Sequence, residues 1–259
     1  ACFFSHNSDL HPCIYGTFAK SLQAGTPTRM RSALVVIPTY NEAESIGQIL
    51  AGLKVLDCDV LVIDDGSPDG TAKIVRGLGV EVIERAGKLG LGSAYRAGFT
   101  LALDRGYTYI IQMDADGSHQ VADLARMMEW IESADLLIGS RWVKDGAIDN
   151  WSRFREYLSK SANTYANLLL SLGVKDTTSG FRIYTSALVK KMEISTIRSE
   201  GYCFQIEMTR RAISRGGSVA EIPITFVERA HGVSKMSLGI ALEAVVRISA
   251  WGALRLIGR

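Results

Sequence analysis

From Ala33 onward, the chain alternates short apolar segments with longer segments whose apolar residues recur at helical spacing. The short segments are rich in β-branched residues and apolar almost throughout, which is typical of strands in a sheet that is covered on both faces. They are ALVVIP (33–38), DVLVID (59–64), VEVIER (80–85), YTYIIQMD (107–114) and ADLLIG (134–139). This alternation predicts an α/β domain with a mostly parallel central sheet flanked by helices.

The segments between these strands predict the helices that cover the sheet. Four of them begin at or near Asn, Pro, Ser or another polar residue, as the first turn of a helix commonly does. They cover residues 41–53, 68–78, 92–106 and 120–133. A fifth helix is predicted within SRFREYLSKSANTYANLLLSL (152–172).

Length and composition limit the class of protein. The chain has 259 residues, of which 47% are hydrophobic, enough for one large α/β domain or two small ones. A net charge of +2, without a long Lys/Arg stripe, predicts no nucleic-acid partner. The cysteines (2, 13, 58 and 203) form no CxxC pair or metal-ligand spacing, which favours a reduced, cytoplasmic chain without zinc or iron–sulfur sites. Residues 1–32 do not resemble a signal peptide, and we expect a poorly ordered tail there.

Polar residues follow four consecutive predicted strands, at the edge of a parallel sheet where ligands bind. The four segments are PTYNE (38–42), DDGSPDG (64–70), RAGKLGLG (85–92) and DADGSH (114–119). One polar residue after a strand, such as Asn41 or Asp69, would commonly be a simple helix cap. Four such ends together indicate a binding site.

Asp114 and Asp116 place two carboxylates one residue apart at the end of a predicted strand. Mg²⁺ and Mn²⁺ bind carboxylate, water and phosphate oxygens together, so the pair suits a metal-bound diphosphate. Two aspartates at this spacing also occur by chance and in turns. The interpretation therefore depends on their place beside three other polar strand ends, with Asp116 as the leading metal ligand.

Other nucleotide-binding and hydrolase motifs do not fit the sequence. The third glycine of a GxGxxG dinucleotide motif would fall at Tyr95, and the Gly87-Lys88 pair is followed by Leu89 instead of the Ser or Thr of a P-loop. The sequence contains no GxSxG motif of an α/β-hydrolase.

Seven segments together resemble the family-2, GT-A-fold glycosyltransferases, and among these the polyprenol- or dolichol-phosphate mannose synthases. They are VVIPTYNE, VIDDGSPDGT, RAGKLGLGSAYRAGF, MDADGSH, GSRW, DTTSGFR and FVERAHGVSK, within residues 33–235. The resemblance implies a single GT-A (Rossmann-like) domain that transfers mannose from GDP-mannose to a polyprenyl (dolichyl-type) monophosphate with inversion, using Mg²⁺ or Mn²⁺. It also implies a peripheral protein at the cytosolic face of a membrane, and it leaves open a separate membrane-anchoring subunit or domain.

The resemblance implies roles for individual residues as well. The nucleotide sugar would contact Pro38, Tyr40, Glu42, Asp64, Asp65, Lys88 and Asp114. The metal ligands would be Asp114 and Asp116, together with Ser118, which stands where the family usually has a longer Gln. The acceptor phosphate would contact Arg141, Arg155, Ser159, Arg229 and Lys235, and the catalytic residues would be Asp114, Asp116, Arg141 and Arg229. A turn-capping role is the alternative for Asp64. The sequence does not decide whether Asp64 or Asp65 is the better candidate for contact with the nucleotide.

The acceptor chemistry explains why arginines are expected. A polyprenyl phosphate is already ionised at neutral pH, so it can attack without a general base and needs only to be positioned. Arg155, Ser159 and Asn163 lie four residues apart and share one helix face, and the planar fork of arginine suits phosphate. For Asp176, orientation of the donor sugar, orientation of Arg182 and a structural turn all stay open.

Residues 236–259 predict an amphipathic helix. Residues 238–257 could reach across a bilayer, but Glu243, Arg247 and Arg255 would be costly at its centre. These charges leave an apolar face with Leu238, Leu242, Val245 and Trp251, so we expect a helix at the membrane interface. A helix packed on the domain is the alternative.

Other functions stay open at this point. A UDP-glucose-dependent polyprenyl-phosphate glucosyltransferase would use the same kinds of side chain. A catalytically inert sugar-nucleotide-binding protein would not need the aspartate pair or the arginines. A processive polysaccharide synthase is disfavoured because Arg141-Trp142 lacks the preceding Gln of QxxRW and because no transmembrane channel is predicted.

Overall fold

The computed structural model describes residues 33–228 and 238–256. The predicted tail (1–32) and the predicted phosphate contacts Arg229 and Lys235 lie outside these residues. In residues 238–243 the description covers the backbone alone.

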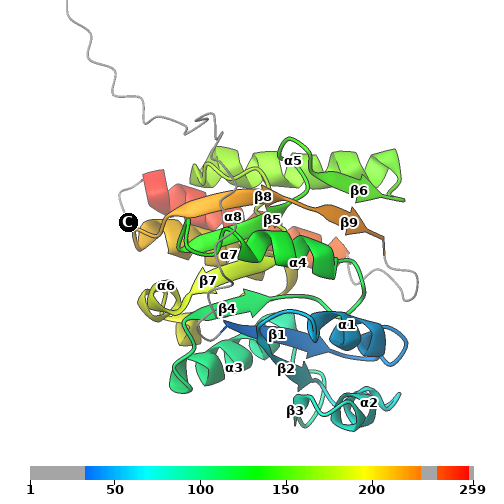
Figure 1. Ribbon diagram of the computed structural model, residues 1–259. Coiled ribbons are helices and arrows are strands. Elements are labelled where there is room, and N and C mark those ends of the chain that lie inside the picture. The colour runs from blue at the N-terminus through cyan, green and yellow to red at the C-terminus, as the bar shows by residue number, and fades with distance from the viewer. Residues whose placement is uncertain (1–32, 229–237, 257–259) are drawn as a thin grey trace, which may run out of the picture.

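A seven-stranded sheet forms the centre of the molecule, with the strand order β3-β2-β1-β4-β7-β5-β8 (Figure 1). Its strands are β1 (Ala33–Thr39), β2 (Asp59–Asp64), β3 (Glu81–Glu84), β4 (Tyr109–Gln112), β5 (Leu136–Ser140), β7 (Arg182–Thr185) and β8 (Val219–Pro223). All pairs are parallel except those of β7, which is antiparallel to both β4 and β5. The predicted mostly parallel sheet is confirmed, with all five predicted strands present; β7 and β8 were not predicted.

A second, two-stranded sheet is formed by β6 (Ala147–Asp149) and β9 (Thr225–Val227), which pair in parallel. Strand β9 follows β8 almost directly along the chain, and Ala147 N–H donates to the carbonyl of Ile224 over 2.9 Å. The small sheet thereby extends the main one on the side of β8.

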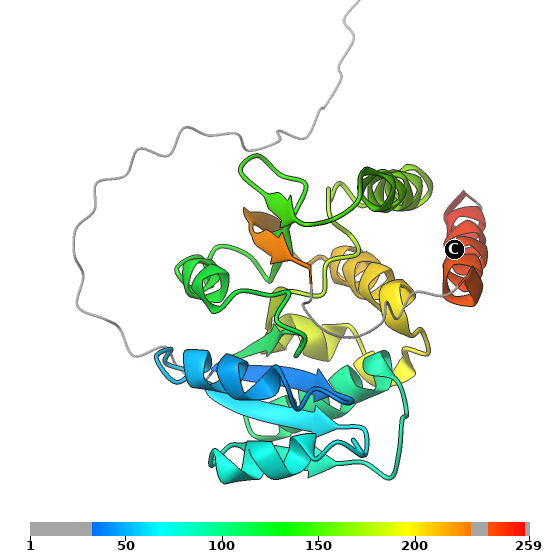
Figure 2. The same ribbon diagram turned by 90° about the vertical axis from the view of Figure 1, so that its right-hand side faces the viewer.

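Helices cover both faces of the main sheet (Figure 2). One face carries α1 (Ile46–Leu53), α2 (Thr71–Gly77) and α4 (Val121–Met128). The other carries α3 (Leu91–Asp104), α5 (Arg153–Leu170), α6 (Ser186–Lys191), α7 (Gly201–Ser214) and α8 (Leu238–Leu256), with a short 3₁₀ helix at Ile194–Thr196. In β1, Leu34 and Val36 pack toward α3, whereas Val35 and Ile37 pack toward α1. Burial of alternate side chains on opposite faces explains why the strand is apolar throughout.

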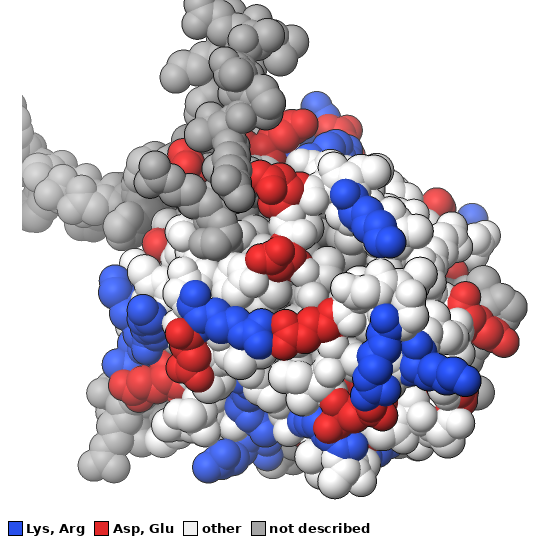
Figure 3. Space-filling model, turned by 60° about the horizontal axis from the view of Figure 1, so that its bottom comes forward, with Lys and Arg blue, Asp and Glu red and all other residues white. Residues whose placement is uncertain are grey.

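Strand β3 forms one edge of the sheet and is protected by charge. Glu81 pairs with Arg105 at 2.6 Å, and Glu84 pairs with Arg76. Figure 3 shows acidic and basic side chains close together over this part of the surface. Charged side chains on an edge strand oppose pairing with another chain.

Helix α8 packs on the domain through Ala244, Ile248 and Trp251. The hydroxyls of Tyr165 on α5 and Ser249 on α8 lie 2.7 Å apart, and the guanidinium of Arg210 lies over the ring of Trp251 at 5.0 Å. Trp251 is half-buried against the domain, as the alternative of a packed helix expects. The side chains of Leu238 and Leu242 lie outside the described ones, and contact of the predicted apolar face with a membrane stays a prediction. Of the described residues, no helix is both long and apolar enough to cross a membrane.

Candidate active site

The polar segments that follow β1, β2, β3 and β4 meet at one edge of the sheet, as predicted. Asp65 N–H donates to the carbonyl of Thr39 over 3.0 Å, and Arg85 N–H donates to that of Asp64 over 2.8 Å. The Ser45 hydroxyl donates to the carbonyl of Ala115 over 2.6 Å, which ties the start of α1 to the DADGSH turn. The parallel register of β1 with β2 and β4 brings these segments together.

The two aspartates of DADGSH are half-buried, and protein donors hold one oxygen of each. The Tyr95 hydroxyl donates to Oδ1 of Asp114 over 2.7 Å. Burial, followed by the charge of Asp114, raises the pKa of Tyr95 well above its ordinary value, so the phenol keeps its proton and remains a donor. Oδ1 of Asp116 accepts from the hydroxyl of Ser118 at 2.6 Å and from its backbone N–H at 3.1 Å. Both carboxylates are therefore oriented by the fold.

His119 is buried behind the DADGSH turn and bonds to its backbone. It is 3% exposed, stacks on Phe181 with 4.6 Å between ring centroids, and accepts the Asp114 backbone N–H at Nδ1 over 3.0 Å. Burial lowers the pKa of His119, so the ring is neutral and carries its proton on Nε2. His119 thus has a structural role beneath Asp114.

The aspartate pair fits a divalent cation that is shared with a ligand. Within the described part of the chain, no group of three or more His, Cys, Asp or Glu could hold a metal by itself. Two carboxylates supply hard oxygen ligands, and Mg²⁺ characteristically completes its shell with substrate phosphates and water. Ser118 is 1% exposed and donates to Asp116, so it orients that carboxylate, and direct metal contact by Ser118 stays a prediction.

Asp64 and Asp65 both have protein partners. Asp64 is fully buried and accepts from the hydroxyls of Thr39 at 2.8 Å and Ser67 at 2.6 Å, as the turn-capping alternative requires. Asp65 accepts from Nε of Arg85 at 2.6 Å and from two backbone N–H groups of the glycine-rich loop. Contact of either carboxylate with a nucleotide stays a prediction.

The other predicted nucleotide contacts lie along the same edge. The ammonium of Lys88 lies 4.5 Å from the ring centroid of Tyr40, which brings together two residues that are 48 positions apart. Pro38 is near the carboxyl end of β1 and pairs in register with Ile63. Glu42 follows closely, and its backbone N–H donates to the hydroxyl of Thr71 over 3.0 Å.

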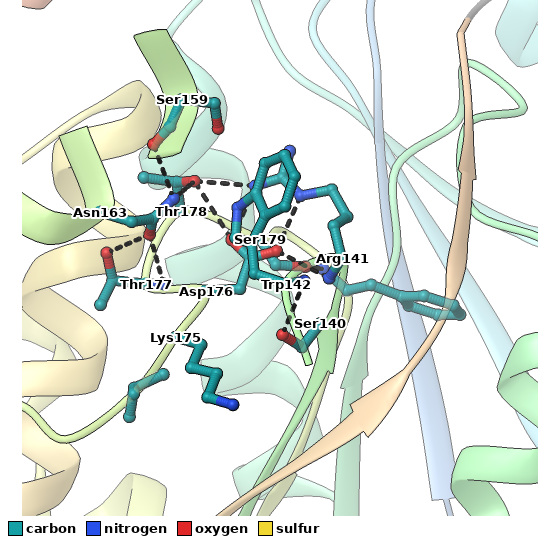
Figure 4. Close-up of polar contacts among 12 residues, drawn as sticks. Ser140, Arg141, Trp142, Ser159, Asn163, Lys175, Asp176, Thr177, Thr178 and Ser179 are labelled. Carbon is teal, nitrogen blue, oxygen red and sulfur yellow. Dashed lines mark hydrogen bonds and ion pairs between the residues drawn. The ribbon is translucent and has the colours of Figure 1, made fainter. Parts of the chain in front are cut away.

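Arg141, at the end of β5, is engaged by Asp176 in a buried bidentate ion pair (Figure 4). Its Nε and one terminal nitrogen donate to the two carboxylate oxygens, each over 2.7 Å, and the same terminal nitrogen donates to the Thr178 hydroxyl over 2.8 Å. Burial is the largest single influence and alone would raise the pKa of Asp176, but the charge and hydrogen bonds of Arg141, together with the charge of Arg182, outweigh it and the pKa is lowered. Direct contact of Arg141 with an acceptor phosphate stays a prediction, since much of its fork is already used.

Of the three roles left open for Asp176, orientation of Arg182 through a hydrogen bond is not the one that this geometry shows. Arg182 is fully buried and donates instead to the backbone carbonyls of Ser179 at 2.7 Å, Thr177 at 2.8 Å and Gln205 at 3.0 Å. Arg182 thus holds the DTTSG loop by donating to its backbone carbonyls, and Arg141 holds the loop by pairing with Asp176.

Helix α5 presents the predicted face to this loop. Asn163 accepts the Thr177 backbone N–H at 2.7 Å and donates to the Ser159 carbonyl at 3.0 Å (Figure 4). One turn further toward the amino end, Arg155 pairs with Glu228 and lies 4.1 Å from the ring centroid of Trp151. Asn163 is therefore directed toward the loop, and Arg155 toward Glu228, directly after β9.

A groove with a volume of about 850 Å³ runs beside α5. It is lined by Trp142, Lys160, Asn163, Leu168, Val174 and Lys175, among other residues. The ammonium of Lys160 lies 4.8 Å from the ring centroid of Trp142 at the rim. The groove therefore combines aromatic and aliphatic walls with two cations.

Comparisons with known proteins agree with this architecture. The family model "Glycosyl transferase family 2" matches residues 34–192. The chain is 46% identical over 228 residues to a polyprenol monophosphomannose synthase of Mycolicibacterium smegmatis, covering 85% of this chain and 86% of that protein. It is 45% identical over 226 residues to an undecaprenyl-phosphate mannosyltransferase of Micrococcus luteus, covering 85% of this chain and 93% of that protein.

Among solved structures, the fold is similar to that of glucosyl-3-phosphoglycerate synthase from Mycobacterium tuberculosis in complex with Mn²⁺, UDP-glucose and phosphoglyceric acid. The TM-score is 0.66 at 19% identity, covering 86% of this chain and 80% of the other. This likeness supports the GT-A-like fold, with its mostly parallel sheet flanked by helices. Since the family model spans more than half of the chain and both relatives align over most of it, this protein belongs to glycosyltransferase family 2.

Proposed function

We propose that this glycosyltransferase transfers mannose from GDP-mannose to a polyprenyl monophosphate, with inversion at the anomeric carbon and with Mg²⁺ or Mn²⁺ as cofactor. The observation that carries the proposal is the 46% identity, over 85% of the chain, to a polyprenol monophosphomannose synthase. The second relative, an undecaprenyl-phosphate mannosyltransferase, supports the same sugar and the same class of acceptor.

The residues at the sheet edge fit the donor half of this reaction. Asp114 and Asp116, held by Tyr95 and Ser118, would bind the divalent cation at the diphosphate. That cation would stabilise the negative charge that the leaving GDP gains. Tyr40 and Lys88 lie together on the same edge, where they would contact the nucleotide.

The acceptor half needs orientation without proton abstraction. A phosphate oxygen of the lipid forms a bond to the anomeric carbon while the bond from that carbon to the diphosphate breaks, so the configuration inverts. We assign Arg155 and Ser159 to hold the attacking phosphate, because they lie one turn apart on α5 in line with Asn163, which contacts the DTTSG loop. The Arg155–Glu228 pair would open or share its charge when phosphate binds.

The purified chain, incubated with Mg²⁺, a short polyprenyl phosphate and labelled GDP-mannose, should form mannose-labelled lipid. UDP-glucose is the informative competitor donor, because the glucosyltransferase alternative differs mainly in base and sugar. If transfer from UDP-glucose equals or exceeds transfer from GDP-mannose, the proposal of GDP-mannose as the donor is wrong. Donor binding without transfer to any polyprenyl phosphate would favour the inert binding protein.

Replacement of Arg155 by alanine should impair transfer about 100-fold while GDP affinity changes less than about twofold, because the guanidinium serves the acceptor. Arg155→Lys should recover only part of the rate, since an ammonium cannot bond two phosphate oxygens in one plane. Steady-state kinetics and calorimetry with GDP measure the two effects separately. A large loss of GDP affinity in Arg155→Ala would move this residue to the donor site.

We further propose that the protein binds a membrane through α5 and α8 together. Four large apolar side chains of α5 are exposed, with exposed fractions of 75% for Phe154, 72% for Tyr157, 43% for Leu158 and 76% for Leu168. On the neighbouring α8, Val245, Val246 and Leu254 are also exposed. The two helices lie on the same side of the molecule (Figures 1 and 2). We name these seven residues the apolar stripe.

Charge and location support a lipid surface as the partner of the apolar stripe. Lys160 and Lys175 line the groove beside Leu168, and Arg255 is exposed at the carboxyl end of α8. Cations flanking an apolar helix face favour anionic lipid, and a polyprenyl phosphate is itself embedded in a bilayer. Four residues of the apolar stripe are on α5, the helix that carries Arg155 and Ser159, so docking would bring these two residues close to the headgroups.

The double variant Phe154→Ser/Leu168→Ser should bind anionic vesicles about tenfold more weakly in sedimentation assays, because two apolar side chains no longer enter the interface. Activity on a short, water-soluble acceptor should stay near that of the parent. Val55→Ser is the matched control, since Val55 is 82% exposed outside the stripe. Unchanged vesicle binding of the double variant would place the lipid contact elsewhere.

A further inference from the structure

We infer that Glu200 is a positioning residue for the donor nucleotide, acting through the glycine-rich loop that carries Lys88. The inference rests on the proposed function, because it assumes that Lys88 contacts the donor. The loop (87–90) connects β3 to α3 at the sheet edge, and the Lys88 side chain is exposed beside Tyr40. If the donor site is to be formed before the donor binds, the backbone of this loop must be fixed by contacts with the rest of the protein.

Asp65 holds the loop from the side of β2. Its Oδ2 accepts the backbone N–H of Leu89 at 3.0 Å and that of Gly90 at 3.1 Å. Arg85 adds a bridge, since it pairs with Asp65 and donates to the Ser93 hydroxyl at 2.7 Å and to the Gly90 carbonyl at 3.1 Å. The loop and helix residues that Asp65 and Arg85 contact, Leu89, Gly90 and Ser93, lie within a few positions of one another.

Glu200 holds the other end of the loop from a distant segment. Its Oε2 accepts the backbone N–H of Gly92 at 2.7 Å, and its Oε1 accepts that of Ser93 at 3.1 Å. These N–H groups belong to the first turn of α3, whose capping residue Gly90 has no side chain to satisfy them. A carboxylate there also interacts favourably with the helix dipole. Glu200 therefore caps α3 from 108 positions away.

The glycines of the loop are needed because Glu200 approaches so closely. A Cβ at Gly90 would lie 2.7 Å from Oε2 of Glu200, and Gly90 has a φ of +99° that disfavours other residues. A Cβ at Gly92 would lie 2.6 Å from the carbonyl oxygen of Ser199. Two of the glycines in RAGKLGLG thus make room for the segment that ends in Glu200. This explains their presence without a GxGxxG motif.

Glu200 also connects the loop to the aspartate turn. It directly precedes α7, and Gln205 on that helix lies near Asp114, since a Cβ at Gly180 would be 3.5 Å from Nε2 of Gln205 and 3.2 Å from Oδ2 of Asp114. The start of α7 therefore contacts the loop of Lys88 and approaches the predicted metal-binding turn. Fixing both in advance lowers the conformational entropy that donor binding must otherwise remove.

Glu200→Ala should weaken GDP binding about tenfold in calorimetry and raise the KM for the donor by a similar factor. The KM for the acceptor should stay within about twofold. A general loss of folded protein would lower turnover and leave both KM values unchanged, so a raised KM for the donor alone distinguishes the two cases. Glu200→Gln should retain most of the affinity, because the amide oxygen can still accept from the first turn of α3. Glu84→Ala is the matched control, since Glu84 is an exposed carboxylate at the end of the edge strand β3 and pairs with Arg76 of α2.

A double-mutant cycle tests whether Glu200 acts through Lys88. Glu200→Ala should cost little further GDP affinity when Lys88 is already alanine, because the loop then has no cation to position. Full additivity of the two losses, or parent-like GDP affinity in Glu200→Ala, would overturn the inference. If Glu200→Ala does not fold, the same cycle with Glu200→Asp decides, because the shorter side chain cannot accept from both N–H groups in the first turn of α3. A parent chain that binds UDP instead of GDP would contradict the proposed donor alone, and the cycle would then be measured with UDP.

Discussion

Asp116→Ala is expected to lower turnover by about 10³-fold or more without unfolding the protein. The carboxylate lies at the turn after β4, where the proposed cation stabilises the departing diphosphate, and charge stabilisation of this kind contributes several kcal/mol to catalysis. The side chain is half-buried at the surface of the turn, so its removal leaves the core intact. Turnover of the purified variant with saturating GDP-mannose and Mg²⁺ measures the effect, and circular dichroism confirms the fold.

Ser118→Ala is the matched control for Asp116. It removes the hydroxyl that orients the carboxylate but keeps the carboxylate, so we expect a loss of only about tenfold. Removal of divalent ions with EDTA should abolish activity in the parent, and Mg²⁺ or Mn²⁺ should restore it. Near-parent turnover in Asp116→Ala, or full activity in EDTA, would contradict the assignment of a metal to this turn.

Asp176→Asn is expected to have the largest effect on stability, lowering the free energy of unfolding by about 3–5 kcal/mol. The substitution keeps the shape of the side chain but leaves the guanidinium of Arg141, whose side chain is 5% exposed, without its counter-charge. The lowered pKa of Asp176 means that its contribution is present above the pKa of the unfolded chain and is lost as pH falls through the folded value. Urea unfolding at neutral and acidic pH measures both effects.

Two comparisons make the Asp176 result specific. Glu81→Gln removes one charge of the exposed Arg105–Glu81 pair and should cost less than about 1 kcal/mol. The double variant Arg141→Met/Asp176→Asn should be more stable than Asp176→Asn, because no unpaired charge then remains buried. An Asp176→Asn variant as stable as the parent would show that water or another group neutralises Arg141.

Local sequence patterns were sufficient for the central architecture. Continuous apolar runs identified β1, β2, β4 and β5, because strands buried on both faces have no polar side to mask them. The edge strand β3, which is mostly exposed, was identified by its shorter β-branched run between two glutamates. Strands β7 and β8 were not predicted. Fully buried Arg182 begins β7, whereas Glu221 lies in the middle of β8 and Pro223 ends it, so neither strand has a continuous apolar run. Their pairing is set by tertiary contacts that no local pattern contains.

The candidate site was predictable where it follows strand ends and unpredictable where it depends on distant partners. The clustering of the DADGSH turn with Tyr40 and Lys88 follows from parallel register, which the sequence pattern implies. The partners of Arg141 and Glu200 lie 35 and more than 100 residues away, and nothing in their spacing selects Asp176 or Gly92. The sequence offered one signal: Arg141 directly follows a buried strand, which predicts a carboxylate partner but does not identify the residue that supplies it.

The C-terminal helix shows the same limit on a smaller scale. A helical wheel finds an apolar face, but it cannot distinguish lipid from the domain itself as the covering surface. In the structure, Trp251 and Ile248 face the core, whereas Val245 and Val246 face outward. Among the described side chains of the two helices, the most exposed large apolar ones, Phe154, Tyr157 and Leu168, are on α5, for which the sequence analysis predicted only a phosphate-binding face.

Anomalous diffraction from crystals grown with Mn²⁺ and GDP tests the central claim most directly, namely that the turn after β4 binds the metal–diphosphate part of the donor. We predict a single strong manganese peak within coordination distance of Asp116, bridged to the diphosphate, with the guanine on the side of Tyr40 and Lys88. A manganese peak remote from Asp114 and Asp116, with GDP bound at another edge of the sheet, would contradict the account.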